Sequence, residues 1–148
     1  MRKVKIIILL LVFVLFTVGC EDESSYRFLH DESEIRSIEI VKVKEYDQAK
    51  ECYSLESLYT AENQENFLQE FQEITCFLSR GGPQGIHEND IVIMICYANG
   101  EYELIDKLGQ AEFTLENEFR NYTGNFYFDV NAFDQFIHNY TDENNVRN

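Results

Sequence analysis

The segment from Asp90 to Asp106 constrains the fold more than any other part of the chain. Asn99 and Gly100 lie near its middle, and both residue types tolerate the positive φ angles that a two-residue type I′ hairpin turn requires. The residues before this turn are apolar on both faces of an extended strand, which is typical of a strand covered on both sides. These residues are Ile91, Val92, Ile93, Met94, Ile95, Cys96 and Tyr97. The sequence therefore predicts a β-hairpin whose first strand is central in an antiparallel sheet.

Five further segments have the composition of strands. Residues 35–44 are rich in Ile and Val, which are enriched in strands because they are β-branched. Ile38 and Ile40 share one face, whereas Val41 and Val43 share the other. This arrangement indicates a bulge, or a strand that is covered on both faces. We expect the remaining strands at residues 52–60, 74–80, 111–118 and 126–130.

Two segments have the periodicity of amphipathic helices. The first helix is expected at residues 60–73, with Thr60 or Asn63 as its N-cap. The second is expected to close the domain, with Asn131 as its cap. The apolar stripes consist of Phe67, Leu68, Phe71 and Ile74 in the first helix and of Phe133, Phe136, Ile137 and Tyr140 in the second.

The order of these elements predicts the fold class. Strands and helices do not alternate along the chain, so a doubly wound parallel sheet is disfavoured. The apolar stripes of the helices need a partner, and the sheet is the one element large enough to bury them. The sequence predicts an α+β fold with a mainly antiparallel sheet of about five to seven strands and two amphipathic helices packed on one of its faces.

The charge of the chain excludes one class of function. Its 12 Lys and Arg residues stand against 27 Asp and Glu residues, which gives a formal net charge of −15. Contacts with phosphates require a basic surface, so we expect no nucleic-acid partner. The same charge disfavours electrostatic adhesion to anionic lipid. Aromatic residues make up 14% of the chain, which is too high a share for a disordered acidic segment.

The first 20 residues have the organisation of an export signal. Three of the first five residues are basic, and residues 6–18 form a 13-residue run that is apolar except for Thr17. A membrane-spanning helix needs about 20 apolar residues. The shorter run matches the hydrophobic region of a signal peptide instead.

The run ends in Thr17-Val18-Gly19-Cys20, which resembles the lipobox of small bacterial lipoproteins. Val18 and Gly19 match that pattern, whereas Thr17 stands where Leu, Val or Ile is usual. The resemblance implies cleavage before Cys20 and attachment of a diacylglyceryl group to its sulfur. Two acyl chains anchor a protein stably to a membrane. The alternative is an uncleaved N-terminal helix in which Cys20 is incidental.

These features divide the chain into four parts. Residues 1–19 are the expected signal peptide, and residues 20–34 are the lipidated Cys20 followed by an acidic tether, whose aromatic middle is a candidate to dock on the domain. Residues 35–141 form a single α+β domain, and residues 142–148 form a polar tail. Cleavage removes three basic residues and leaves nine against 27 acidic ones, a net charge of −18.

Three cysteines remain beside Cys20, namely Cys52, Cys76 and Cys96. Outside the cytoplasm they could form one disulfide and leave one free thiol. Each also lies in an apolar strand, where cysteine is commonly a small buried hydrophobe, and we favour buried thiols. The sequence contains no Cys-x-x-Cys motif, so nothing in it supports a redox enzyme.

His87, Glu88 and Asp90 form a compact polar cluster in an expected loop. These residue types could contribute ligands to a divalent cation, but the spacing of a zinc site is missing. Solvated loops are commonly polar for no further reason. His87, Glu88 and Asp90 are therefore weak candidates for metal ligands. The sequence carries no cofactor motif.

No local motif for a nucleophile, a phosphate-binding loop or a pair of catalytic acids occurs in the chain. The leading hypothesis is a membrane-anchored extracytoplasmic lipoprotein that acts as a binding or protein-interaction module. Its partner would be an envelope protein or another envelope component, and a neutral or basic one suits the negative charge. Two alternatives remain open. One is a small hydrolase-like enzyme whose residues meet only in the fold, and the other is a divalent-metal-binding lipoprotein.

Overall fold

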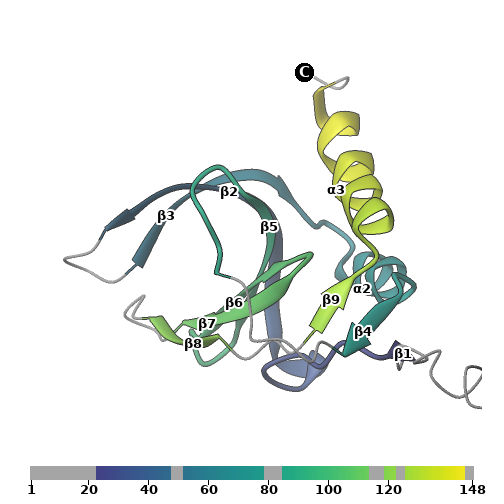
Figure 1. Cartoon of the computed structure of the whole chain (residues 1–148), viewed down its shortest axis with the longest axis horizontal. Coiled ribbons are helices and arrows are strands. Elements are labelled where there is room, and N and C mark those ends of the chain that lie inside the picture. The colour runs from purple at the N-terminus through teal and green to yellow at the C-terminus, as the bar shows by residue number, and fades with distance from the viewer. Residues whose placement is uncertain (1–22, 48–51, 79–84, 114–118, 123–125, 146–148) are drawn as a thin grey trace, which may run out of the picture.

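The structure is a computed structural model that describes residues 23–47, 52–78, 85–113, 119–122 and 126–145 (Figure 1). Its helices are η1 (Glu32–Glu34, a 3₁₀ helix), α2 (Gln64–Gln72) and α3 (Val130–Asn145). Its strands are β1 (Glu23–Ser24), β2 (Ile35–Asp47), β3 (Cys52–Thr60), β4 (Cys76–Leu78), β5 (Ile91–Tyr97), β6 (Tyr102–Asp106), β7 (Gly109–Phe113), β8 (Phe119–Tyr122) and β9 (Phe126–Phe128).

The strands form two antiparallel sheets. The larger sheet has six strands in the order β3-β2-β5-β6-β7-β8, and the smaller has three in the order β1-β4-β9. The predicted fold class is confirmed: the domain is α+β, with a mainly antiparallel sheet and two α-helices in its described part. Strand β5 lies between β2 and β6, as its two apolar faces predict.

The main hydrophobic core lies between one face of the six-stranded sheet, the two helices and the three-stranded sheet. Helices α2 and α3 and strands β4 and β9 lie together on one side of the curved sheet in Figure 1. Phe67 of α2 packs edge-on against Phe136 of α3, with ring centroids 4.9 Å apart. The sheet contributes to this cluster Ile38, Ile40, Ile93, Ile95, Tyr97 and Ile105, all buried.

The opposite face of the six-stranded sheet, concave in Figure 1, carries a second apolar cluster. Val41, Val43 and Val92 are fully buried there. Register shifts between Ile40 and Val41, and between Val43 and Glu45, interrupt the pairing of β2 with β3. Such bulges increase local twist and bend a strand, which accounts for the curvature of this edge of the sheet.

The hairpin between β5 and β6 differs in its turn from the prediction. Tyr97 donates its N–H to the carbonyl of Glu101, and Gly100 donates its N–H to the carbonyl of Tyr97, both at 2.9 Å. The loop is therefore three residues long, Ala98 to Gly100, and only Gly100 has a positive φ, 86°. The expected type I′ turn is wrong because a three-residue loop needs one left-handed residue at its end.

The helix caps show one agreement and one correction. Asn63 caps α2, where its side chain accepts the N–H of Asn66 at 3.0 Å. For α3 the predicted cap Asn131 is wrong, because the helix begins at Val130. The carboxylate of Asp129 accepts the N–H of Ala132 at 2.9 Å and takes that role. Both side chains satisfy N–H groups that have no partner within the helix.

Several predicted boundaries shift. The strand expected at residues 111–118 is β7 and begins at Gly109, and residues 114–118 lie outside the described part. The strand expected at residues 74–80 is limited to Cys76–Leu78 within the described residues. Helix α3 continues to Asn145, into the residues expected to form the polar tail.

The segment expected to be a tether packs on the domain from Glu23 onward. Glu23 and Ser24 pair with β4, and the next aromatic residue, Tyr26, is 9% exposed. The ring of Tyr26 lies 5.1 to 5.6 Å from those of Phe28, Phe71, Phe126 and Phe128. We call residues 23–31 the N-terminal strap.

No helix in the described part of the chain is long and apolar enough to cross a membrane.

Candidate functional site

A buried carboxylate lies beneath the N-terminal strap. Glu103 of β6 is fully buried, and it is the one charged residue among the buried residues of the described chain. The hydroxyl of Tyr26 donates a hydrogen bond to its Oε2 at 2.8 Å. The hydroxyl of Tyr97 and, at 3.3 Å, the N–H of Leu29 donate to its Oε1. Burying a charged group is costly unless hydrogen bonds compensate it, and these donors supply that compensation.

The alternation of β6 explains the position of Glu103. Tyr102 and Leu104 face the concave side, so Glu103 and Ile105 face the core that the helices cover. Tyr97 extends from β5 on the same face, because its neighbour Cys96 pairs with Tyr102 in the register of the hairpin. The hairpin thus places one donor beside Glu103, and the strap brings the other two.

Burial and the charge of Glu103 raise the pKa of the Tyr26 hydroxyl well above its ordinary value of 10.0. The pKa of Tyr97 is raised by burial and by the same carboxylate. Both phenols are therefore neutral donors at physiological pH. Hydrogen bonds from neutral donors to a charged acceptor are among the stronger ones in proteins.

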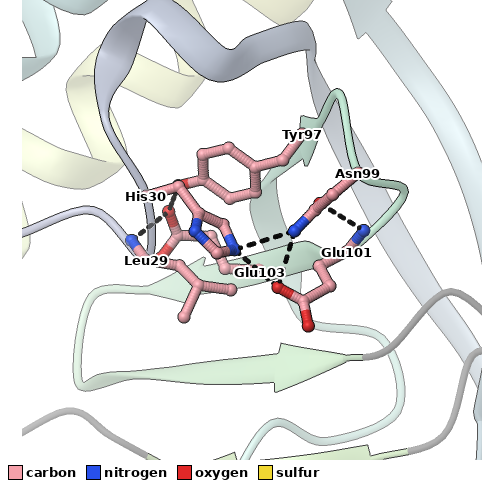
Figure 2. A network of polar contacts seen from close by, with 6 residues as sticks. All are labelled: Leu29, His30, Tyr97, Asn99, Glu101 and Glu103. Atoms are coloured by element: carbon pink, nitrogen blue, oxygen red, sulfur yellow. Dashed lines mark hydrogen bonds and ion pairs between the residues drawn. The ribbon is translucent and has the colours of Figure 1, made fainter.

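A second polar cluster fastens the end of the strap to the hairpin turn (Figure 2). Nε2 of His30 lies 2.5 Å from Oε2 of Glu101. The side-chain amide of Asn99 donates to the same oxygen at 2.9 Å, and the N–H of Glu101 donates to Oδ1 of Asn99 at 2.9 Å. The ring of His30 stands edge-on to Tyr97 with centroids 4.8 Å apart. His30 and Glu101 are half-buried, and Asn99 is exposed.

The geometry of Glu103 suits a structural role, in which it holds the N-terminal strap against the domain, better than a catalytic one. A general base must come within hydrogen-bond reach of its substrate. Glu103 is fully buried and already accepts three hydrogen bonds. Its two carboxylate oxygens instead connect the strap, the β5–β6 hairpin and the aromatic core.

A groove opens on the concave face of the six-stranded sheet. Its volume is about 610 Å³, within the range of ligand-binding sites. Tyr53 donates its hydroxyl to the carbonyl of Ile86 at 2.9 Å, which fixes one wall. Arg36 is exposed and is the one charged side chain among the lining residues. The lining consists of Arg36, Ser37, Tyr53, Leu55, Met94, Cys96, Tyr97, Gly100 and Tyr102.

Cys96 and Cys76 are free thiols on opposite sides of the fold. Cys96 is half-buried in the groove, and burial raises the pKa of its thiol. Cys76 is 2% exposed in the main core, and burial raises its pKa to about 11. Cys52 begins β3, but its side chain lies outside the described residues, as does Cys20.

The metal candidates do not form a cluster in the described residues. Oδ2 of Asp90 accepts the N–H of His87 at 2.7 Å and lies 3.6 Å from Nδ1 of the same residue. His87 and Glu88 are exposed. The described residues contain no group of three or more His, Cys, Asp or Glu side chains that could hold a metal ion. Asp90 thus contributes to the turn before β5.

A second hollow lies between the start of β5 and helix α3, with a volume of about 470 Å³. Its ionisable groups are partly paired: Lys107 contacts Asp134 at 2.9 Å, and His138 contacts Asp142 at 3.1 Å. Burial, together with the charge of Asp90, raises the pKa of Asp106 there.

Comparison of the chain with protein-family models, with curated proteins and with solved structures finds no match in any of the three.

Sequence reasoning did not single out Glu103 or the groove. The signal for Glu103 was present, because Ile105 on the same face of β6 marks that face as apolar. The signal for the groove was present in part, since Met94 and Cys96 share one apolar face of their strand. The lining residues of β2 and β3, such as Ser37 and Leu55, come close to Met94 and Cys96 only because the sheet curves.

Proposed function

We propose that the chain is an exported lipoprotein, anchored through lipid on Cys20 to the outer face of a bacterial membrane, that acts as a binding module for an envelope protein. The anchoring rests on the signal-like residues 1–20, described above. The binding role rests on one observation, the groove on the concave face of the six-stranded sheet.

The groove has the lining that protein partners use. Tyr53 contributes a half-buried aromatic ring, and Leu55 and Met94, also half-buried, add apolar area. Tyrosine and methionine are enriched at protein interfaces, and aromatic anchors in pockets carry much of the binding energy. The groove is open rather than enclosed, which allows a segment of a partner to lie along it.

Charge indicates the chemistry of the partner. After the proposed cleavage before Cys20, nine basic residues stand against 27 acidic ones, a net charge of −18, so an acidic partner is repelled at long range. The lining itself is mostly neutral apart from Arg36. The partner segment that fits is neutral or basic overall and presents apolar side chains to the floor of the groove.

Site-specific photocrosslinking in cells tests this proposal. A photoreactive residue replaces Met94, which is half-buried in the groove, in the full-length chain. The matched control carries the same residue at Glu65, which is exposed on helix α2. We expect one envelope protein crosslinked from position 94 and none from position 65.

Two results would contradict the proposal. The same products from both positions, or none from either, would show that the groove selects no partner. An adduct at position 94 with only the mass of a small molecule would replace the protein partner by a small ligand.

A further inference from the structure

Strand β1 fixes the place where the chain leaves the domain towards Cys20. Glu23 pairs with Phe77 and Ser24 pairs with Cys76, in antiparallel register. Going backward along the chain from Ser24 to Glu23 therefore corresponds to going forward along β4, towards Leu78. The end of β1 that leads back to Cys20 thus lies at the Phe77 and Leu78 end of β4, and β4 in turn pairs with β9 (Figure 1).

The distance from this point to the anchor is short. Three Cα–Cα steps separate Cys20 from Glu23, and each spans at most about 3.8 Å, so the reach is about 11 Å or less. The polar layer on each side of a bilayer is roughly 5 to 8 Å thick. A lipid on Cys20 thus brings the β1–β4–β9 sheet to the membrane surface.

This sheet carries apolar surface where it meets that boundary. Phe77 of β4 and Tyr127 of β9 stack with ring centroids 5.1 Å apart and planes inclined by 24°. Leu78, the next residue of β4, points to the opposite face of this sheet and is 47% exposed, the highest value among the exposed large hydrophobic residues of the described chain. Aromatic side chains with one polar end are typical of the membrane–water interface. An apolar contact also needs no basic residues, which suits the negative charge of the domain.

We infer that Phe77, Leu78 and Tyr127 form a second membrane contact, which holds the domain against the bilayer in one orientation. The inference rests on the lipid anchor at Cys20 proposed above. The lipid then supplies the attachment, and these three residues, which lie on both faces of the sheet near the Leu78 end of β4, determine which end of the domain faces the bilayer. The groove lies on the far side of the six-stranded sheet from β4 and β9 and so stands apart from this contact.

Tryptophan fluorescence tests the orientation, because the chain contains no Trp. Leu78→Trp is prepared as the lipidated protein in phosphatidylcholine vesicles, with and without brominated acyl chains. Ile91→Trp is the matched control, since Ile91 is 39% exposed and lies in the six-stranded sheet. We expect roughly twofold quenching for Leu78→Trp, because interfacial aromatic side chains contact the acyl chains, and none for Ile91→Trp.

Each outcome decides the inference. One outcome is that neither variant is quenched by the brominated chains, although the protein carries lipid and floats with the vesicles. That result would overturn the inference and leave the anchor intact. Equal quenching of both would show that the domain has no fixed orientation and would also overturn it. Mass spectrometry that finds no lipid on Cys20 would remove the anchor and the inference with it. Tyr127→Trp repeats the measurement if Leu78→Trp does not keep the circular dichroism of the wild type.

Discussion

Tyr26 and Glu103 lie 77 positions apart in the chain and are joined by a hydrogen bond of 2.8 Å in the interior. Tyr26 belongs to the N-terminal strap, and Glu103 belongs to β6, the third strand from the β8 edge of the six-stranded sheet. This contact makes the strap part of the folded domain. In the proposed lipoprotein, it links the segment nearest the anchor to the core.

Replacing Tyr26 with Phe should lower the free energy of unfolding by about 2 kcal/mol, because a hydrogen bond to a charged group contributes about 1.5–3 kcal/mol. The ring contacts of Tyr26 with Phe28 and Phe71 remain in this variant. Urea unfolding measures the change. Tyr140→Phe is the control, since its hydroxyl donates to the exposed Glu70, and its loss should be below about 1 kcal/mol. Equal losses would contradict the special role of the buried contact.

Replacing Glu103 with Gln should be more damaging than Tyr26→Phe. The amide keeps one oxygen, but its NH₂ group now faces a phenol that donates in the wild type. A buried donor without an acceptor costs about 1–3 kcal/mol, and the charged hydrogen bonds are lost as well. We expect a loss of about 3 kcal/mol or more, measured by the same unfolding experiment. Glu101→Gln, which changes the half-buried carboxylate of the neighbouring cluster, should cost less; a reversed order would contradict this account.

Stability should fall at alkaline pH. Burial raises the pKa of Tyr26 and Tyr97 above the ordinary value of 10.0 in the folded state. A group whose pKa is raised on folding contributes stability that is fully present below its unfolded pKa and is lost above it. The contribution should hold from neutral pH to about pH 10 and decline beyond it. Urea unfolding at a series of pH values up to about 11 measures the free energy of unfolding, and the absorbance of tyrosinate shows when the phenols ionise. Unchanged stability of the wild type across that range would count against the buried phenols.

The two described thiols should differ in reactivity. Cys96 is half-buried in the groove, whereas Cys76 is 2% exposed with a pKa of about 11. The thiolate is the reactive form, so a neutral alkylating reagent should modify Cys96 slowly and Cys76 only after unfolding. Peptide mapping by mass spectrometry separates the two sites. Modification of Cys76 at the rate of Cys96 in the native protein would contradict the described core.

The elements that could be predicted from the sequence are those determined by local patterns. The apolar stripe of α2 and its Asn63 cap follow from spacing within one helix, and the central position of β5 follows from its two apolar faces. The loop at Asn99 and Gly100 was placed correctly and given the wrong turn type, because dipeptide preferences do not determine loop length.

The buried network and the groove depend on contacts that no local pattern encodes. The aromatic middle of the acidic stretch indicates docking on the domain, but the partner of Tyr26 is determined only when β1 pairs with β4. From the sequence alone, Glu103 has the pattern of a solvent-facing polar residue of a strand, and its burial results from contacts with the N-terminal strap. The groove requires the bulges of β2, whose effect on sheet curvature involves several strands at once.

Lipid labelling of Cys20 tests the central claim most directly. Cells that express the full-length chain or Cys20→Ala are grown with a labelled fatty acid, and the purified proteins are compared. The account predicts label on the wild type, located by mass spectrometry on an N-terminal cysteine, and none on Cys20→Ala. Equal label on both proteins, or none on either while residues 1–19 remain attached, would contradict it.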